Sequence, residues 1–193
     1  MLLKKKNVII SFVLAFILAA SGYYYFAIYN SVHDVYLASD YKGFSSAEAL
    51  FSEAELVVIG SPIKDFEDRK LHLTRFSTGH IEDIVTFTEI KVEKVLKGPE
   101  EDGVDLTVIE PIGIYQTFEG KKRIARAGYT EMKKGSQYVI FLSKNAFGQY
   151  GVINMQAGKF NLDGTDPADI LAENSNKQTI FTELTTNYAQ ELK

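Results

Sequence analysis

The first clear pattern along the chain is an apolar run near its N-terminus. Between Val8 and Ala20 only Ser11 interrupts the apolar series, and the stretch from Tyr23 to Tyr29 continues it without a charge. A helix needs about 20 residues, at about 1.5 Å each, to cross the hydrocarbon core of a bilayer. The pattern therefore predicts a transmembrane helix over residues 7–29.

The charges that flank this run predict its orientation. Three lysines precede it, and the next Lys or Arg after it is Lys42. The positive-inside rule then places residues 1–6 in the cytoplasm and makes residues 7–29 a signal anchor. The expected product is a single-pass protein of the cell membrane with an extracytoplasmic C-terminal part. The tyrosines that end the run suit the outer interface, where a ring with a polar tip is favoured.

A cleaved signal peptide shares much of this pattern and stays as an alternative. Small residues at Ala19–Gly22 offer a cleavage site. The aromatic segment extends the apolar length beyond a typical signal core, which favours a retained helix, and either form is exported. Thioether lipidation is excluded because the chain has no cysteine. The absent cysteine and the lysine-first anchor suggest a Gram-positive membrane.

After a weakly patterned juxtamembrane spacer at residues 30–45, the pattern becomes that of short strands. Ser45 and Glu48 form a capping box that predicts a helix over about 46–54. Apolar stretches bounded by turn residues then predict strands at about 56–59, 84–96, 104–109, 137–142, 150–155 and 158–162.

The segments between and after these strands complete the expected domain. Residues 69–83 and 112–135 are predicted to be loops or irregular. A short helix over Ala168–Glu173 and an amphipathic C-terminal helix follow the last strand. The predicted fold class is mainly β, with about five or six antiparallel strands flanked by helices in one domain over residues 46–193. A sheet of this size tends to curl into a small barrel.

The amino-acid composition excludes several kinds of functional site. With no cysteine among 193 residues, disulfides, thiolate catalysis and Cys-ligated metal sites are excluded. All 25 acidic residues lie beyond residue 30 and three of the 21 basic ones lie before it, so the exported part carries a formal charge of −7. Such an acidic domain is a poor candidate for nucleic-acid binding.

One segment runs against this acidic background. Between Glu119 and Gly135 six basic residues face two acidic ones, a local excess of +4. Such a segment could meet an anionic polymer or lipid surface, or an envelope protein, close to the membrane; the alternative is a solvated loop. The candidate ligand-binding or surface-binding residues are Lys121, Lys122, Arg123, Arg126 and Tyr129.

No catalytic or metal-binding residue is predicted. Ser61 and Lys64 match the S-x-x-K pattern by spacing, but in a strand positions three apart point to opposite faces. The histidines lack the spacing of a zinc site, and no cofactor is expected. An enzyme is therefore less expected than a binding module, and a hydrolase with converging carboxylates is the alternative.

The strand sequence also resembles a known class of exported domains. The segments concerned are Glu53–Gly60, Phe87–Gly98, Gly135–Leu142 and Gly158–Phe160. Together they resemble netrin-like modules, which include the tissue inhibitors of metalloproteinases. The resemblance implies an OB-like barrel used for binding. Those inhibitors act through an N-terminal cysteine, which this chain lacks, so their activity is not implied.

Overall fold

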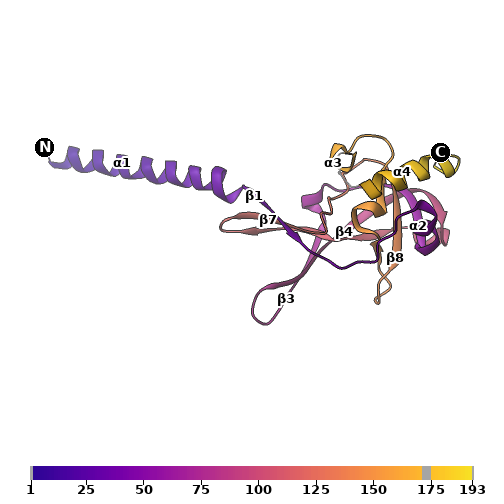
Figure 1. Cartoon of the computed structure of the whole chain (residues 1–193). Coiled ribbons are helices and arrows are strands. Elements are labelled where there is room, and N and C mark those ends of the chain that lie inside the picture. Colours follow the sequence, from indigo (N-terminus) through magenta and orange to yellow (C-terminus); the bar gives the residue numbers. More distant parts are fainter. Residues whose placement is uncertain (1, 171–174, 193) are drawn as a thin grey trace. The chain divides into compact units, whose positions relative to one another are not determined.

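The structure is a computed structural model that describes residues 2–170 and 175–192 (Figure 1). By its contacts the chain divides into two compact units. The helix unit comprises the N-terminal residues through Val35 together with Ile114–Arg123. The barrel unit comprises Tyr36–Gly113 and the chain from Ile124 onward.

The helix unit begins with one long apolar helical segment. Helix α1, Leu2–Tyr23, continues into a π-helical turn η1, Tyr24–Tyr29. Within it, Asn7–Tyr29 is long and apolar enough to cross a membrane, judged by length and composition, and none of its apolar window is buried inside the protein. This agrees with the range predicted from the sequence.

The barrel unit holds a closed barrel of five strands. Its strands are β2 (Leu56–Pro62), β4 (Ile81–Lys97), β5 (Thr107–Glu110), β8 (Tyr138–Lys144) and β9 (Tyr150–Val152). They pair in the order β8–β2–β4–β5–β9, and β9 pairs back with β8 to close the ring. All these pairs are antiparallel except β5–β9, which is parallel. The expected small OB-like barrel with flanking helices is thereby confirmed.

Two strands of the barrel are apolar on both faces because both faces are buried. In β8, Tyr138, Ile140 and Leu142 point into the barrel interior. Val139 and Phe141, which alternate with them, point to a second core outside the barrel wall. This outer core is covered by α2 (Ala47–Glu53) and α4 (Ser175–Asn187). The unbroken apolar runs in the sequence therefore mark the strands that lie between two cores.

Several short elements complete the described chain. They are η2 (Phe66–Asp68), β3 (Lys70–Arg75), η3 (Glu100–Gly103), η4 (Met155–Gly158), β10 (Lys159–Asn161) and α3 (Pro167–Ile170). Strand β10 extends the sheet beside β8. Helix α3 confirms the beginning of the short helix predicted over Ala168–Glu173, and its predicted end lies outside the described residues.

Three segments predicted as loops or spacer contain strands instead. Residues 30–45 include β1 (Val32–Leu37). Residues 69–83 contain β3, which forms a hairpin with the first half of β4. Residues 112–135, predicted to be irregular, form the hairpin β6 (Ile112–Thr117) and β7 (Gly120–Arg126), and these strands join β1 in a three-stranded sheet. Most of their side chains are exposed or half-buried, so they lack the apolar alternation that identifies a buried strand.

Candidate functional site

A cleft opens on the barrel wall where β5 separates from β4. The two strands are paired as far as Glu89 and Thr107, and the Ile90 N–H donates to the Leu106 carbonyl across 2.9 Å. Just before Leu106, Asp105 adopts a left-handed conformation (φ 51°), which changes the direction of the chain ahead of β5. The cleft at this point has a volume of about 530 Å³.

The cleft has an apolar floor and charged sides. Its lining residues are Ile63, Glu89, Ile90, Lys91, Val92, Gly103, Asp105, Leu106 and Thr107. Ile90 and Leu106 are buried and belong to the barrel core, which makes the floor rigid. Ile63 is held at the rim because its N–H donates to the Glu89 carbonyl across 3.2 Å, and 47% of its surface is exposed. The cleft can therefore receive apolar groups and pair with charges of either sign.

The 3₁₀ turn η3, which forms one side of the cleft, packs closely against β4. A Cβ atom on Gly103 would lie 2.9 Å from Val95 Cγ2, closer than such atoms approach. Glycine thus lets the 3₁₀ turn approach β4 and fixes the width of the cleft on that side.

The predicted basic residues are divided between the two units. Lys121, Lys122 and Arg123 lie on β7 in the helix unit, whereas Arg126 and Tyr129 belong to the barrel unit. Lys122 lies 3.7 Å from Glu119, and Arg123 lies 3.8 Å from Asp34.

The remaining candidates have structural contacts inside the barrel unit. Arg126 forms a short ion pair with Asp83. Tyr129 was expected on the same surface as the basic residues, and the structure corrects this. Only 1% of its surface is exposed, and its hydroxyl donates to Glu110 across 3.0 Å. A tyrosine next to a basic segment suggests a binding surface. In the structure the ring is buried instead and its hydroxyl is hydrogen-bonded, which is the usual arrangement of a buried tyrosine.

The charge excess of this segment is much smaller in the folded protein than in the sequence. Arg123, Arg126 and Lys134 pair with Asp34, Asp83 and Asp65, three acids from outside the segment. The formal excess falls from +4 to +1 when these acids are counted with it. A charge count along the sequence misses these three acids, because they are distant in the chain and only folding brings them close to the basic residues.

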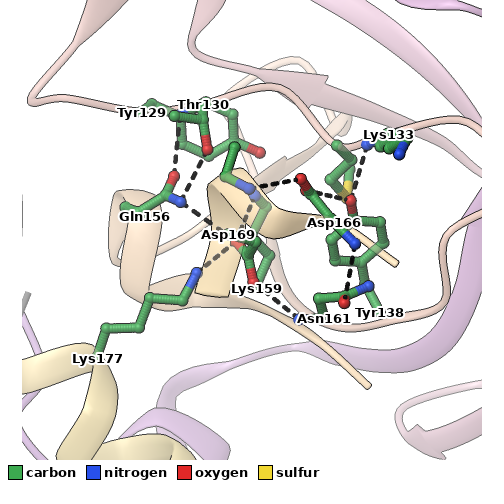
Figure 2. A network of polar contacts seen from close by, with 12 residues as sticks. Tyr129, Thr130, Lys133, Tyr138, Gln156, Lys159, Asn161, Asp166, Asp169 and Lys177 are labelled. Atoms are coloured by element: carbon green, nitrogen blue, oxygen red, sulfur yellow. Dashed lines mark hydrogen bonds and ion pairs between the residues drawn. The ribbon is translucent and has the colours of Figure 1, made fainter. Parts of the chain in front are cut away.

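The barrel unit also holds a buried polar network centred on Asp169 (Figure 2). Asp169 lies on α3, and its Oδ1 accepts from Lys159 Nζ at 2.7 Å and from Lys177 Nζ at 2.5 Å. Its Oδ2 accepts from the Asn161 N–H at 2.9 Å. All three charged side chains are at most 6% exposed. The network therefore joins β10, α3 and α4 at one point.

Burial controls the electrostatics of this network. Desolvation, reinforced by the neighbouring charge of Lys159, lowers the pKa of Lys177 to about 8. Desolvation opposes ionisation of Asp169 as well, but the two ammonium groups outweigh it, and the pKa of Asp169 is lowered. Asp169 thus stays ionised and pairs with two cations in a site that excludes water.

Beside it, Tyr138 connects two loops through its hydroxyl. The hydroxyl donates to Asp166 Oδ2 across 2.6 Å and accepts from the Lys133 N–H across 2.8 Å (Figure 2). Burial, and then the bond to Asp166, raise the pKa of Tyr138. The phenol therefore stays protonated and acts as a structural link.

A second buried ion pair joins Arg69 and Glu110 across 2.8 Å, with 1% and 0% of their side chains exposed. Arg69 also donates to the Met132 carbonyl at 2.6 Å. Glu110 also accepts from the Met132 N–H at 2.8 Å and from the Tyr129 hydroxyl. Through Tyr129 and Met132 the pair attaches the segment that follows β7 to the barrel wall.

Sequence reasoning missed both buried networks. The ion-pair partners are separated by 8 to 41 residues, so no short motif marks them. One signal was present: Lys159 stands between Gly158 and Phe160 in the strand predicted at about 158–162. A charge at such a position indicates a buried partner. Among the described residues no group of His, Asp and Glu has the arrangement of a metal site.

Comparison with known protein families and with curated proteins finds no family and no relative that matches this chain. The class that the structure defines is a closed five-stranded barrel with flanking helices, preceded by an apolar helix. The resemblance to netrin-like modules rests on the strand sequence and this barrel alone.

Proposed function

We propose that this chain is a single-pass membrane protein whose exported barrel binds a polypeptide partner at the cell envelope through the β4–β5 cleft. The observation that carries the proposal is the cleft itself, with its rigid apolar floor and charged sides. In OB-type barrels the second and third strands form the face that binds ligands. Strands β4 and β5 hold these positions in this barrel.

The lining favours a polypeptide over other ligands. None of the described residues that line the cleft is aromatic, so it offers no ring on which a sugar or base would stack. Glu89 and Asp105 repel a polyanion, and the exported part is acidic overall. A polypeptide segment supplies apolar side chains for the floor and charges of both signs for the sides.

The hydrolase alternative has less support from this cleft. Glu89 and Asp105 both line it, but Asp105 is exposed and Glu89 already pairs with Lys64. General acid catalysis needs a carboxyl group whose pKa is raised, usually by burial. Neither carboxylate is buried, so the cleft favours binding over acid–base chemistry.

The membrane part of the proposal is supported by the apolar segment Asn7–Tyr29 and the three lysines before it. The lysines favour a cytoplasmic N-terminus and an extracytoplasmic barrel. Cleavage at Ala19–Gly22 would release the same barrel without an anchor. The absence of cysteine supports the further expectation of a Gram-positive cell membrane.

The proposal is tested by site-specific photo-crosslinking of the full-length protein in intact cells. A photoreactive residue is placed at Ile63, on the cleft rim, and in a second variant at Phe76, which is similarly exposed on the β3–β4 turn. We expect a discrete protein adduct from position 63 and none from position 76. Equal adducts from both positions, or none from either, would contradict the proposal.

A charge reversal gives a second, matched test of the cleft. Lys91 and Lys70 are both exposed lysines on strands, but only Lys91 lines the cleft. Lys91→Glu should weaken the adduct from position 63, whereas Lys70→Glu should leave it unchanged. An adduct that resists Lys91→Glu would move the binding surface away from this cleft.

A further inference from the structure

The hairpin tip between β6 and β7 carries an exposed aromatic side chain. The turn consists of Phe118 and Glu119, and 87% of the surface of Phe118 is exposed. The turn itself is well fixed: the Thr117 hydroxyl donates to the Gly120 carbonyl at 2.7 Å and accepts from the Glu119 N–H at 3.1 Å. Single exposed apolar rings are common on protein surfaces, so the place of this ring relative to the apolar helical segment decides what it can contact.

This tip is bonded to the end of the apolar helical segment. The Tyr24 hydroxyl donates to the Phe118 carbonyl across 2.8 Å, and the Gln116 side-chain amide donates to the Tyr29 carbonyl across 2.9 Å. On the other strand the Lys121 N–H donates to the Ser31 carbonyl across 2.7 Å. All three contacts lie within the helix unit.

The order of these contacts gives the direction of the hairpin. Its strands contact Ser31 and Tyr29, whereas its tip contacts Tyr24, which lies further back in the apolar segment. Tyr24 precedes the end of the segment by five residues, which is more than one helical turn. Helical side chains also tilt toward the N-terminus of the helix, which here is toward the middle of the span. The tip therefore lies at the depth of the last turns of the segment.

Gly120 permits this close approach. It has φ +116°, and a Cβ atom there would lie 2.5 to 2.9 Å from the Ser31 side chain and from the Ser31 and Ile28 carbonyls. Only glycine combines this conformation with this separation.

The charges around the tip suit a bilayer surface. Glu119 is exposed, but Lys122 lies 3.7 Å away and offsets its charge. Lys121 follows on the same strand, and long lysine side chains can extend to lipid phosphates while their stems stay in apolar surroundings. The four tyrosines at the end of the segment occupy the same interfacial level.

We propose that the β6–β7 hairpin is a second membrane contact, in which Phe118 enters the outer interface of the bilayer beside Tyr24 and Lys121 and Lys122 meet the lipid head groups. This inference rests on the proposed membrane anchoring of residues 7–29, and it is independent of the cleft. The membrane contact then consists of a helix and a hairpin fastened together, rather than a helix alone.

The chain has no tryptophan, so one introduced tryptophan reports on its own position. Three full-length variants are reconstituted in phosphatidylcholine–phosphatidylglycerol vesicles, with and without bromine on the acyl chains: Phe118→Trp at the tip, Phe16→Trp within the span, and Phe147→Trp. Phe147 is the matched control, because it lies in the β8–β9 turn and is also 87% exposed. We expect F118W to emit at a shorter wavelength than F147W and to lose intensity in brominated lipid, as F16W does.

The variants separate the two proposals. If F16W is quenched by brominated lipid and F118W behaves like F147W, the hairpin contact is wrong and the anchor stands. If F16W is not quenched, the proposed anchoring fails and the hairpin contact with it. Equal quenching of F118W and F147W would reflect general adsorption to the vesicle and would also overturn the hairpin contact.

Discussion

Lys159 donates to Asp169 across 2.7 Å, and both side chains are almost completely removed from solvent. Lys177, from the C-terminal helix α4, shares the same carboxylate oxygen. One carboxylate thus pairs with two ammonium groups at the point where β10, α3 and α4 meet. The network connects the elements around the outer core, so its removal should lower the free energy of unfolding.

Asp169→Asn should destabilise the fold by about 3 kcal/mol, because breaking a buried ion pair leaves charges without compensation. The free energy of unfolding is measured by urea titration of the full-length protein in detergent micelles, followed by far-ultraviolet circular dichroism.

The matched control is the exposed pair of Lys42 and Glu53, which are 67% and 48% exposed. Glu53→Gln should cost at most about 1 kcal/mol, since exposed ion pairs contribute little. Equal losses for the two variants would mean that the Asp169 network does not fasten the fold.

Lys177 should give stability an unusual dependence on pH. Its pKa is lowered from 10.5 to about 8 in the folded protein, first by burial and then by Lys159. Between these values the unfolded chain binds the proton more tightly, so the free energy of unfolding should rise with pH across this window. Relative to Lys177→Met, the wild type should gain on the order of 2–3 kcal/mol between pH 8 and 10.5.

The comparison with Lys177→Met isolates this contribution. Tyrosines whose pKa is raised by burial, such as Tyr129, lower the free energy of unfolding of both proteins above pH 10. This effect is the same in both proteins and cancels in the difference. A difference that stays flat from pH 8 to 10.5 would contradict a lowered pKa for Lys177.

The fold was predictable where apolar patterning is local. The runs at 56–59 and 138–142 are apolar on both faces because each strand separates the barrel interior from the core under α2 and α4. The apolar segment at 7–29 was predictable because it is long enough to cross a membrane. The parallel pairing of β5 with β9 was not predictable, because it depends on which edges meet when the barrel closes.

The candidate sites were much less predictable, for two physical reasons. More than half of the residues in β6 and β7 are only half-buried, so their sequence lacks a continuous buried face, and β1, which pairs with β7, lies about 90 residues earlier. The cleft depends on where β5 leaves β4, which the left-handed residue Asp105 and the close packing of Gly103 set in three dimensions. Neither feature has a sequence motif.

Gly120→Ala should release the hairpin from the helix end. The added methyl group would clash with the Ser31 and Ile28 carbonyls, and φ +116° is strained for alanine. In the F118W background we therefore expect emission to shift to longer wavelength and quenching by brominated lipid to fall. Gly148→Ala is the control: Gly148 also has positive φ, but a Cβ there meets nothing within 4 Å. It should leave F118W emission unchanged. If G120A leaves that emission unchanged as well, the fit at Gly120 does not position the tip.

The orientation of the chain can be tested directly because it contains no cysteine, so each introduced thiol is unique. With a cytoplasmic N-terminus, Phe147→Cys on the exposed β8–β9 turn should react with a membrane-impermeant maleimide in intact cells. Lys4→Cys should react only after the membrane is permeabilised, and an N-terminal tag should remain on the membrane-bound protein. Reaction of K4C in intact cells with protection of F147C would reverse the orientation. Loss of the tag, with F147C recovered in the medium, would establish cleavage at Ala19–Gly22. In that case the chain would lose most of its membrane-spanning helix, only η1 would remain beside the β6–β7 hairpin, and the barrel would act as a secreted binding module.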